Sequence, residues 1–363
     1  MRPIPRARVL CASILPLAMA TVSISAAAQS ATGPSSTGPY KILKTVKVGG
    51  DGGFDYVTAD PTNRRLYVAR SGAAPIGRIN VFNLDTLAPT GEIANTSAHG
   101  AAIDVASNHA FGSSKPIAMW DAKTLAPIKT IDVQGNPDGM LAEPSTGRIY
   151  ILSHAAPNLT VLDAKDGSIA GTVDLGGAPE QAASDGNGHL YIDLEDKDKI
   201  AVVDTKTLTL TTTYDLAGKG GTCAGLAMDV KSKILFAACR NPQAMVVLDA
   251  TTGKILDTLP IGAGTDGALF DPATMEVFSS QGDGTLTVVK ENSPTSFSVE
   301  QNLTTLPRAK TLTLDPKTGH LFLITAEFGP VPAPAAPTPD NPNPRPARPP
   351  MIPGTFSILV VGK

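Results

Sequence analysis

The stretch FDYVTADPTNRRLYVARSGAAPIGRINVFNLD, residues 54–85, decides the fold because it is the first clear copy of a unit that returns along the whole chain. It contains an Asp-Pro turn at residues 60–61, an apolar strand around Tyr67 and a second apolar strand at residues 79–82. Self-similarity at a fixed period is the signature of a repeat architecture, in which each copy forms one module. The unit therefore has to be identified before any single residue is interpreted.

One aromatic residue in the first apolar strand marks each copy of the unit. These register aromatics follow each other at spacings of 44, 39, 41, 45, 42 and 44 residues: Tyr67, Phe111, Tyr150, Tyr191, Phe236, Phe278 and Phe322. Seven residues before each of them lies a side chain that is acidic in six of the seven copies: Asp60, Asp104, Glu143, Ser184, Asp229, Asp271 and Asp315. Such an oxygen can accept backbone N–H bonds in the turn between two strands. We therefore predict the same β-hairpin in every copy.

Each copy continues into further β-rich runs, such as IKTIDVQG at residues 128–135, so that a copy contains about four strands. Short, evenly spaced strands with Gly, Asp and Pro turns are typical of a sandwich, barrel or propeller. Seven four-stranded copies predict an all-β, seven-bladed β-propeller. Residues 40–49 resemble the last strand of a copy, whereas residues 355–361 supply a third strand with nothing after it. We expect the N-terminal strand to complete the last blade and close the ring.

The repeats at residues 60–70 (DPTNRRLYVAR), 143–153 (EPSTGRIYILS) and 315–325 (DPKTGHLFLIT), with NPDG at 136–139, resemble the YVTN-type (YncE-like) β-propeller repeat family. The resemblance covers essentially the whole mature chain, although the asparagine that usually follows the tyrosine by three residues is absent. It implies a propeller that is often exported, and it does not fix one activity.

The chain is expected to begin with an export signal. Residues 1–28 combine three arginines, an apolar run and small residues before Gln29, which is the pattern of a cleaved signal peptide. A membrane anchor is the alternative, but Ser, Thr and Pro16 interrupt the apolar run. Residues 29–39 read as a flexible leader and residues 40–363 as the propeller. We therefore expect a periplasmic or secreted monomer with no membrane span after cleavage.

A proline-rich loop, residues 329–354, interrupts the last repeat. Proline at this density favours an extended loop without regular hydrogen bonding. It is either a tolerated surface insertion or an arm that docks a partner or covers one face. The charged run at residues 195–199 is interpreted as a solvated turn.

Charge excludes one class of partner. The signal segment holds three of the 30 basic residues and no acidic residue, so the mature chain has 27 basic and 33 acidic residues, a net charge of −6. Binding of nucleic acid needs a basic face, so no nucleic-acid partner is expected.

Cys223 and Cys239 flank a hairpin turn and lie nearly opposite each other. This arrangement favours a disulfide in an oxidising compartment, with two free buried thiols as the alternative.

Candidate site residues follow from the repeat. Counting twelve residues back from each register aromatic reaches the start of the innermost strand, where polar side chains should meet at the channel mouth: Asp55, His99, Asp138, Pro179 with Glu180 next to it, Asp266 and Lys310. Arg70 and Gln281, three residues after their aromatics, are further candidates. The other histidines, His109, His154, His189 and His320, lie at or beside turns and are interpreted as solvated.

Two functions remain open at this stage. The first is a non-enzymatic propeller that binds a protein, peptide or small ligand, since the chain contains no HExxH, GxSxG or Walker motif. The second is a lactonase-like hydrolase with Asp55, Asp138, Glu180 and Asp266 as ligands of a divalent cation and His99 as a base. No cofactor is predicted for the first function, and the same polar residues can also simply cap strands beside a water-filled channel.

Overall fold

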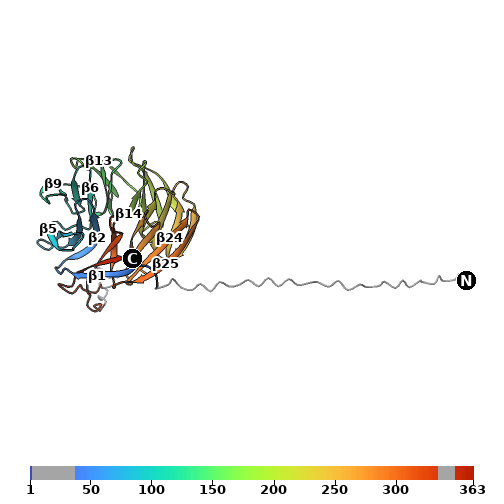
Figure 1. The fold of residues 1–363 in the computed structure, drawn as a ribbon. Helices are drawn as coiled ribbons and strands as arrows, with labels where there is room; N and C mark the ends of the chain where they lie inside the picture. Colours follow the sequence, from blue (N-terminus) through green and yellow to red (C-terminus); the bar gives the residue numbers. More distant parts are fainter. Residues whose placement is uncertain (2–36, 334–347) are drawn as a thin grey trace. The chain divides into compact units, whose positions relative to one another are not determined.

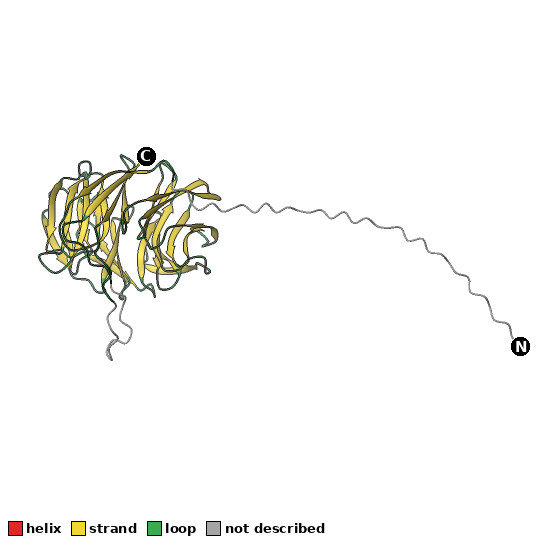
Figure 2. Cartoon of the chain, turned by 90° about the horizontal axis from the view of Figure 1, so that it is seen from below, coloured by secondary structure: helices red, strands yellow, loops and turns green. Residues whose placement is uncertain are grey.

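The computed structural model describes residue 1, residues 37–333 and residues 348–363. From residue 37 onward, these residues form seven antiparallel sheets of four strands, arranged as blades around a central axis (Figure 1). The described part consists of strands joined by turns and loops, and none of it is a helix long and apolar enough to cross a membrane (Figure 2). The seven-bladed propeller predicted from the repeat is confirmed.

The first four blades each run from an innermost to an outermost strand in chain order. Blade 1 contains β2 (Gly53–Asp60), β3 (Arg65–Ser71), β4 (Arg78–Asn83) and β5 (Pro89–Ala94). Blade 2 contains β6 (Ala101–Asp104), β7 (His109–Gly112), β8 (Ile117–Asp121) and β9 (Pro127–Ile131). Blade 3 contains β10 (Pro137–Glu143), β11 (Arg148–Ser153), β12 (Leu159–Asp163) and β13 (Ile169–Val173). Blade 4 contains β14 (Pro179–Ser184), β15 (His189–Leu194), β16 (Lys199–Asp204) and β17 (Thr209–Asp215).

The last three blades include the closure of the ring. Blade 5 contains β18 (Cys223–Asp229), β19 (Ile234–Arg240), β20 (Gln243–Asp249) and β21 (Ile255–Pro260). Blade 6 contains β22 (Thr265–Asp271), β23 (Glu276–Gln281), β24 (Thr285–Ser293) and β25 (Ser296–Thr304). Blade 7 contains β26 (Lys310–Asp315), β27 (His320–Thr325), β28 (Ser357–Gly362) and, from the N-terminal side, β1 (Lys41–Lys47). The predicted closure by residues 40–49 is confirmed, because β1 pairs antiparallel with β28.

The hydrophobic core is divided among the spaces between neighbouring blades. Seven clusters of buried side chains fill these spaces, and each cluster contains one of the seven register aromatics. All seven aromatics are at least 95% buried. One large ring per interface explains the fixed register: a blade cannot bury its own apolar face and needs the next blade to cover it.

The turns between the first and second strands are held as predicted. In every blade, the side chain seven residues before the register aromatic accepts backbone N–H bonds from the turn; Asp60, for example, accepts them from Thr62 and Asn63. The same bonds occur at Asp104, Glu143, Ser184, Asp229, Asp271 and Asp315. The short polar oxygen is therefore what fixes each hairpin.

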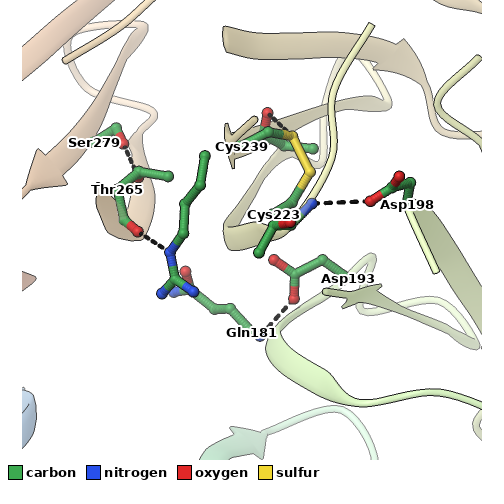
Figure 3. The surroundings of a disulfide bond; sticks show 10 residues. Gln181, Asp193, Asp198, Cys223, Cys239, Thr265 and Ser279 are labelled. Carbon is green, nitrogen blue, oxygen red and sulfur yellow. Dashed lines mark hydrogen bonds between the residues drawn. A yellow bond between two sulfur atoms is a disulfide. The ribbon is translucent and has the colours of Figure 1, made fainter. Parts of the chain in front are cut away.

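Two features modify the repeat. Cys223 and Cys239 face each other on β18 and β19 and form a disulfide within blade 5 (Figure 3). The stem of the proline-rich loop is ordered by a bridge between Phe328 and Met351 and by a hydrogen bond from the Gly329 N–H to the Pro350 carbonyl. The predicted signal peptide, most of the leader and residues 334–347 lie outside the described residues.

Candidate functional site

The site is built where the innermost strands begin, around the central channel. In six of the seven blades, the pairing of the innermost strand with the second strand shifts register at this point. A β-bulge of this kind re-aims side chains. Four of the predicted residues sit inside these bulges: Asp55, Asp138, Glu180 and Asp266.

On one side of the channel, carboxylates alternate with imidazoles. The His99 Nδ1 atom lies 3.0 Å from the Asp55 Oδ2 atom and 3.5 Å from the Asp138 Oδ1 atom. His154, in the loop after β11, places its Nε2 atom 3.5 Å from Asp138 Oδ2 and 3.6 Å from Glu180 Oε1. Asp138 thus lies between two histidines, and four blades contribute to one polar wall.

The opposite side consists of ion pairs. Arg240, at the end of β19, donates hydrogen bonds to the Glu195 carboxylate at 3.1 Å and to the Asp266 carboxylate at 2.5 Å. Lys310 donates to the other oxygen of Asp266. Asp266, one of the predicted metal ligands, is therefore already neutralised by two cations.

Tyr56 and Gln181, which follow Asp55 and Glu180 in the same bulges, connect blades across the channel. The Tyr56 side chain crosses from blade 1 and donates its hydroxyl to the Glu180 carbonyl at 2.9 Å. The Gln181 amide bonds to backbone groups of Leu226 and Ala268 on the next two blades. Glycine makes room for the Tyr56 ring, since a Cβ atom on Gly100 would lie 3.2 Å from the Tyr56 Cβ atom.

Burial and crowding of carboxylates shift several pKa values. Burial, together with the charge and hydrogen bond of Glu195, raises the pKa of Glu180 to about 10. Burial raises the pKa of Asp193, on β15, to about 7. Burial and the charge of Asp55 also raise the pKa of Asp138. The hydrogen bond to Asp55 raises the pKa of His99 above that of a free imidazole, so this ring holds its proton more tightly.

A cavity of about 840 Å³ opens at the mouth of the channel. Its polar lining includes Asp55, His99, Arg240, Asp266, Lys310, Asp283, Arg308 and Arg348. Its apolar lining includes Phe54, Phe328 and Met351, of which the last two come from the stem of the proline-rich loop. The insertion in blade 7 therefore contributes directly to this cavity.

Arg70 and Gln281 do not line the cavity; the structure places both inside the blades, where they are fully buried. Arg70 donates to the carbonyls of Gly49, Gly50 and Gly52 and lies 3.8 Å from the centre of the Phe356 ring, and burial lowers its pKa to about 10. Gln281 accepts from Thr285 and Thr287. Both side chains hold loops whose neighbouring residues form the cavity wall.

Three residues of the site are not among those that the repeat predicts: His154, Glu195 and Arg240. His154 is exposed after β11, as interpreted, but its imidazole also lies beside Asp138 and Glu180, which the sequence did not indicate. The interpretation of Glu195 as part of a solvated charged turn is wrong, because its carboxylate pairs with Arg240. All three lie four residues after a register aromatic, rather than the three that led to Arg70 and Gln281. Because side chains alternate along a strand, positions three and four residues away lie on opposite sides, and only the fourth faces the channel.

Comparisons with known proteins add evidence on the fold alone. No protein-family model matches this sequence, and no curated protein matches it. Among solved structures, the chain is similar to U3-55K, with 10% identity, a TM-score of 0.67 and coverage of 90% of this chain and 99% of that chain. The WD40 repeats of RRP9 match with 10% identity, a TM-score of 0.68 and coverage of 91% and 99%. A chain of the mitotic checkpoint complex matches with 13% identity, a TM-score of 0.67 and coverage of 87% and 95%.

Proposed function

We propose that this propeller is a binding protein that holds a small anionic ligand with an apolar body in the cavity at its channel mouth. One observation carries the proposal: the cavity of about 840 Å³ combines the guanidinium groups of Arg308 and Arg348 with the apolar side chains of Phe54, Phe328 and Met351. Its volume is in the range of pockets for small ligands, which are mostly apolar with a few placed polar groups.

The two arginines are available to a ligand. Within residues 37–333 and 348–363, no carboxylate forms an ion pair with Arg308 or Arg348, whereas Arg240 and Lys310 are engaged by Asp266. Arg308 lies over the Phe328 ring at 4.7 Å, which keeps its guanidinium beside the apolar surface. A carboxylate attached to an aromatic or aliphatic group matches this pairing, because guanidinium groups bind carboxylates through two hydrogen bonds.

Titration with a series of carboxylates tests the proposal. Phenylacetate should bind more tightly than acetate, because the larger ligand covers the apolar lining. Arg308→Gln and Arg348→Gln should each weaken the binding of phenylacetate roughly tenfold, about 1.4 kcal/mol. The matched control is Lys129→Gln, which removes a cation from the exposed strand β9. Equal affinity for phenylacetate and the neutral phenylacetamide would contradict the proposal.

The lactonase-like alternative is not the function that we propose. It places a cation among Asp55, Asp138, Glu180 and Asp266, but Asp266 is bound by Arg240 and Lys310. A cation at that carboxylate would face two positive charges at close range, which opposes its binding.

We also propose that the protein is a YVTN-type propeller that is exported to the periplasm or secreted. The repeat motifs at residues 60–70, 143–153 and 315–325 support the family, and the signal-like residues 1–28 support export. The disulfide adds support, since disulfides persist in oxidising compartments. N-terminal sequencing of the protein from the expressing cells tests export: the expected first residue is Gln29, and retention of Met1 in the cytoplasm would contradict it.

A further inference from the structure

Three side chains of the polar wall described above form a group that does not line the mouth cavity. Asp138 and His154 come from blade 3, and Glu180 comes from the neighbouring blade 4. One potential ligand atom of each residue lies within 4.8 Å of the other two. The group is therefore separate from the cavity residues that carry the proposed ligand binding.

The distances within this group are those of metal ligands rather than of hydrogen bonds. The His154 Nε2 atom lies 3.5 Å from Asp138 Oδ2 and 3.6 Å from Glu180 Oε1, beyond the usual N–H···O range. In a tetrahedral site with bonds of about 2.1 Å, neighbouring ligand atoms are about 3.4 Å apart. The two distances from His154 match this spacing, and the Asp138 and Glu180 oxygens lie within 4.8 Å of each other, so the three atoms can converge on one ion.

The surroundings leave this group short of positive charge. Among the described residues, no lysine or arginine forms an ion pair with Asp138 or Glu180; their ion-pair partners are the two histidines. The Oδ1 atom of Asp138 is buried and receives no hydrogen bond. Glu195 adds a further carboxylate beside Glu180, and Arg240 is shared between Glu195 and Asp266. A buried carboxylate without a donor is costly unless a cation or a proton compensates it.

Backbone contacts fix the strands that carry Asp138 and Glu180. The Tyr56 hydroxyl donates to the Glu180 carbonyl at 2.9 Å, which fixes β14 from the opposite side of the channel. A Cβ atom on Gly139 would lie 2.8 Å from that same carbonyl, so only glycine lets β10 approach β14 this closely. His99, whose Nδ1 atom is hydrogen-bonded to Asp55, lies 3.5 Å from the second oxygen of Asp138 and so adjoins the three ligands.

We propose that Asp138, His154 and Glu180 bind one divalent transition-metal ion, with Zn²⁺ and Mn²⁺ as the best-matched ions. One imidazole and two carboxylates suit these ions, whereas Ca²⁺ and Mg²⁺ prefer oxygen ligands alone. Three protein ligands leave a further coordination position open towards the channel. The site goes beyond the proposed ligand binding and stands on different residues.

Calorimetric titration of the EDTA-treated, folded protein with Zn²⁺, Mn²⁺, Mg²⁺ and Ca²⁺ tests the site. Wild type should bind one Zn²⁺ or Mn²⁺ per chain, more tightly than Mg²⁺ or Ca²⁺. Loss of a residue behind a ligand already costs about 10- to 100-fold in affinity, so His154→Gln and the near-isosteric Glu180→Gln should each cost more than about 100-fold. Absence of transition-metal binding, or a preference for Ca²⁺, would overturn the proposal.

His189→Gln is the matched control, because His189 pairs with Asp185 at 2.8 Å outside the channel. Its zinc affinity should equal that of wild type, and an equal loss in both histidine variants would overturn the assignment to His154. The visible spectrum of bound Co²⁺ provides a second readout, which should disappear in His154→Gln. The melting temperature of the metal-free variant shows whether it is folded. Arg308→Gln should retain metal binding, so failure of this site and failure of ligand binding are distinguishable.

Discussion

Asp193 places a carboxyl group where water does not reach it. Its Oδ1 atom accepts the Gln181 N–H at 2.6 Å, and its buried Oδ2 atom has no hydrogen-bond partner (Figure 3). Burial raises its pKa to about 7 in the folded protein, whereas an aspartate in an unfolded chain ionises near pH 4. Between these values the folded state keeps a proton that the unfolded state has released, so Asp193 makes the protein less stable as pH rises from about 4 to 7.

Asp193→Asn should remove this loss of stability. An amide oxygen can still accept the Gln181 N–H, but it does not ionise, so the variant should be more stable than wild type at pH 8 by about 2–4 kcal/mol. At pH 4 the two proteins should differ little. Urea unfolding between pH 4 and 8 measures the difference, with Asp132→Asn as the control at an exposed site. Parallel stability profiles for wild type and Asp193→Asn would show that the carboxyl is not buried as described.

The innermost strands show which parts of the site follow from the repeat. Counting twelve residues back from the register aromatics led to Asp55, His99 and Asp138 and to the neighbour of Glu180, and the structure brings these side chains together. The bulges that contain Asp55, Asp138 and Glu180 re-aim these side chains, and no motif in the sequence marks them. The position of each side chain along its strand was predictable from the repeat period, but the direction in which the side chain points was not.

Site residues that could not be predicted from the sequence lie at the ends of the second strands of three blades. His154, Glu195 and Arg240 follow their aromatics by four residues, but the alternation that would assign them to the channel is only useful once one side of the strand is known to be buried. The fully buried Arg70 marks that side, yet an arginine gives no hint of burial in a sequence. The contribution of Phe328 and Met351 to the cavity was equally hidden, because the path of a long insertion does not follow from a repeat.

Closure of the ring depends on β1, which covers the outer edge of β28. All six residues of β28 are buried, whereas β1 is mostly exposed. A chain that starts at Val48 lacks β1 and should therefore expose a long apolar edge strand, which pairs readily with other chains. We expect this chain to form oligomers and to melt at a lower temperature.

Size-exclusion chromatography with light scattering checks the expectation. The control chain starts at Thr37 and keeps β1 together with Tyr40, whose backbone N–H and carbonyl are both bound by the Gln301 side chain. Only the shorter chain should self-associate. If both chains are monomers with equal melting temperatures, β1 is dispensable for closing the ring.

The direction of the β1–β28 pair also sets how the ring responds to mechanical tension. Lys41 lies opposite Gly362 and Lys47 lies opposite Ser357, so residues 40 and 363 emerge at the same end of the paired strands. Tension between these two residues loads the hydrogen bonds one after another from that end, whereas ends at opposite sides would load all of them together. We therefore expect the ring to open by stepwise separation of β1 from β28. The other six blades are each built from one continuous segment and should separate only afterwards.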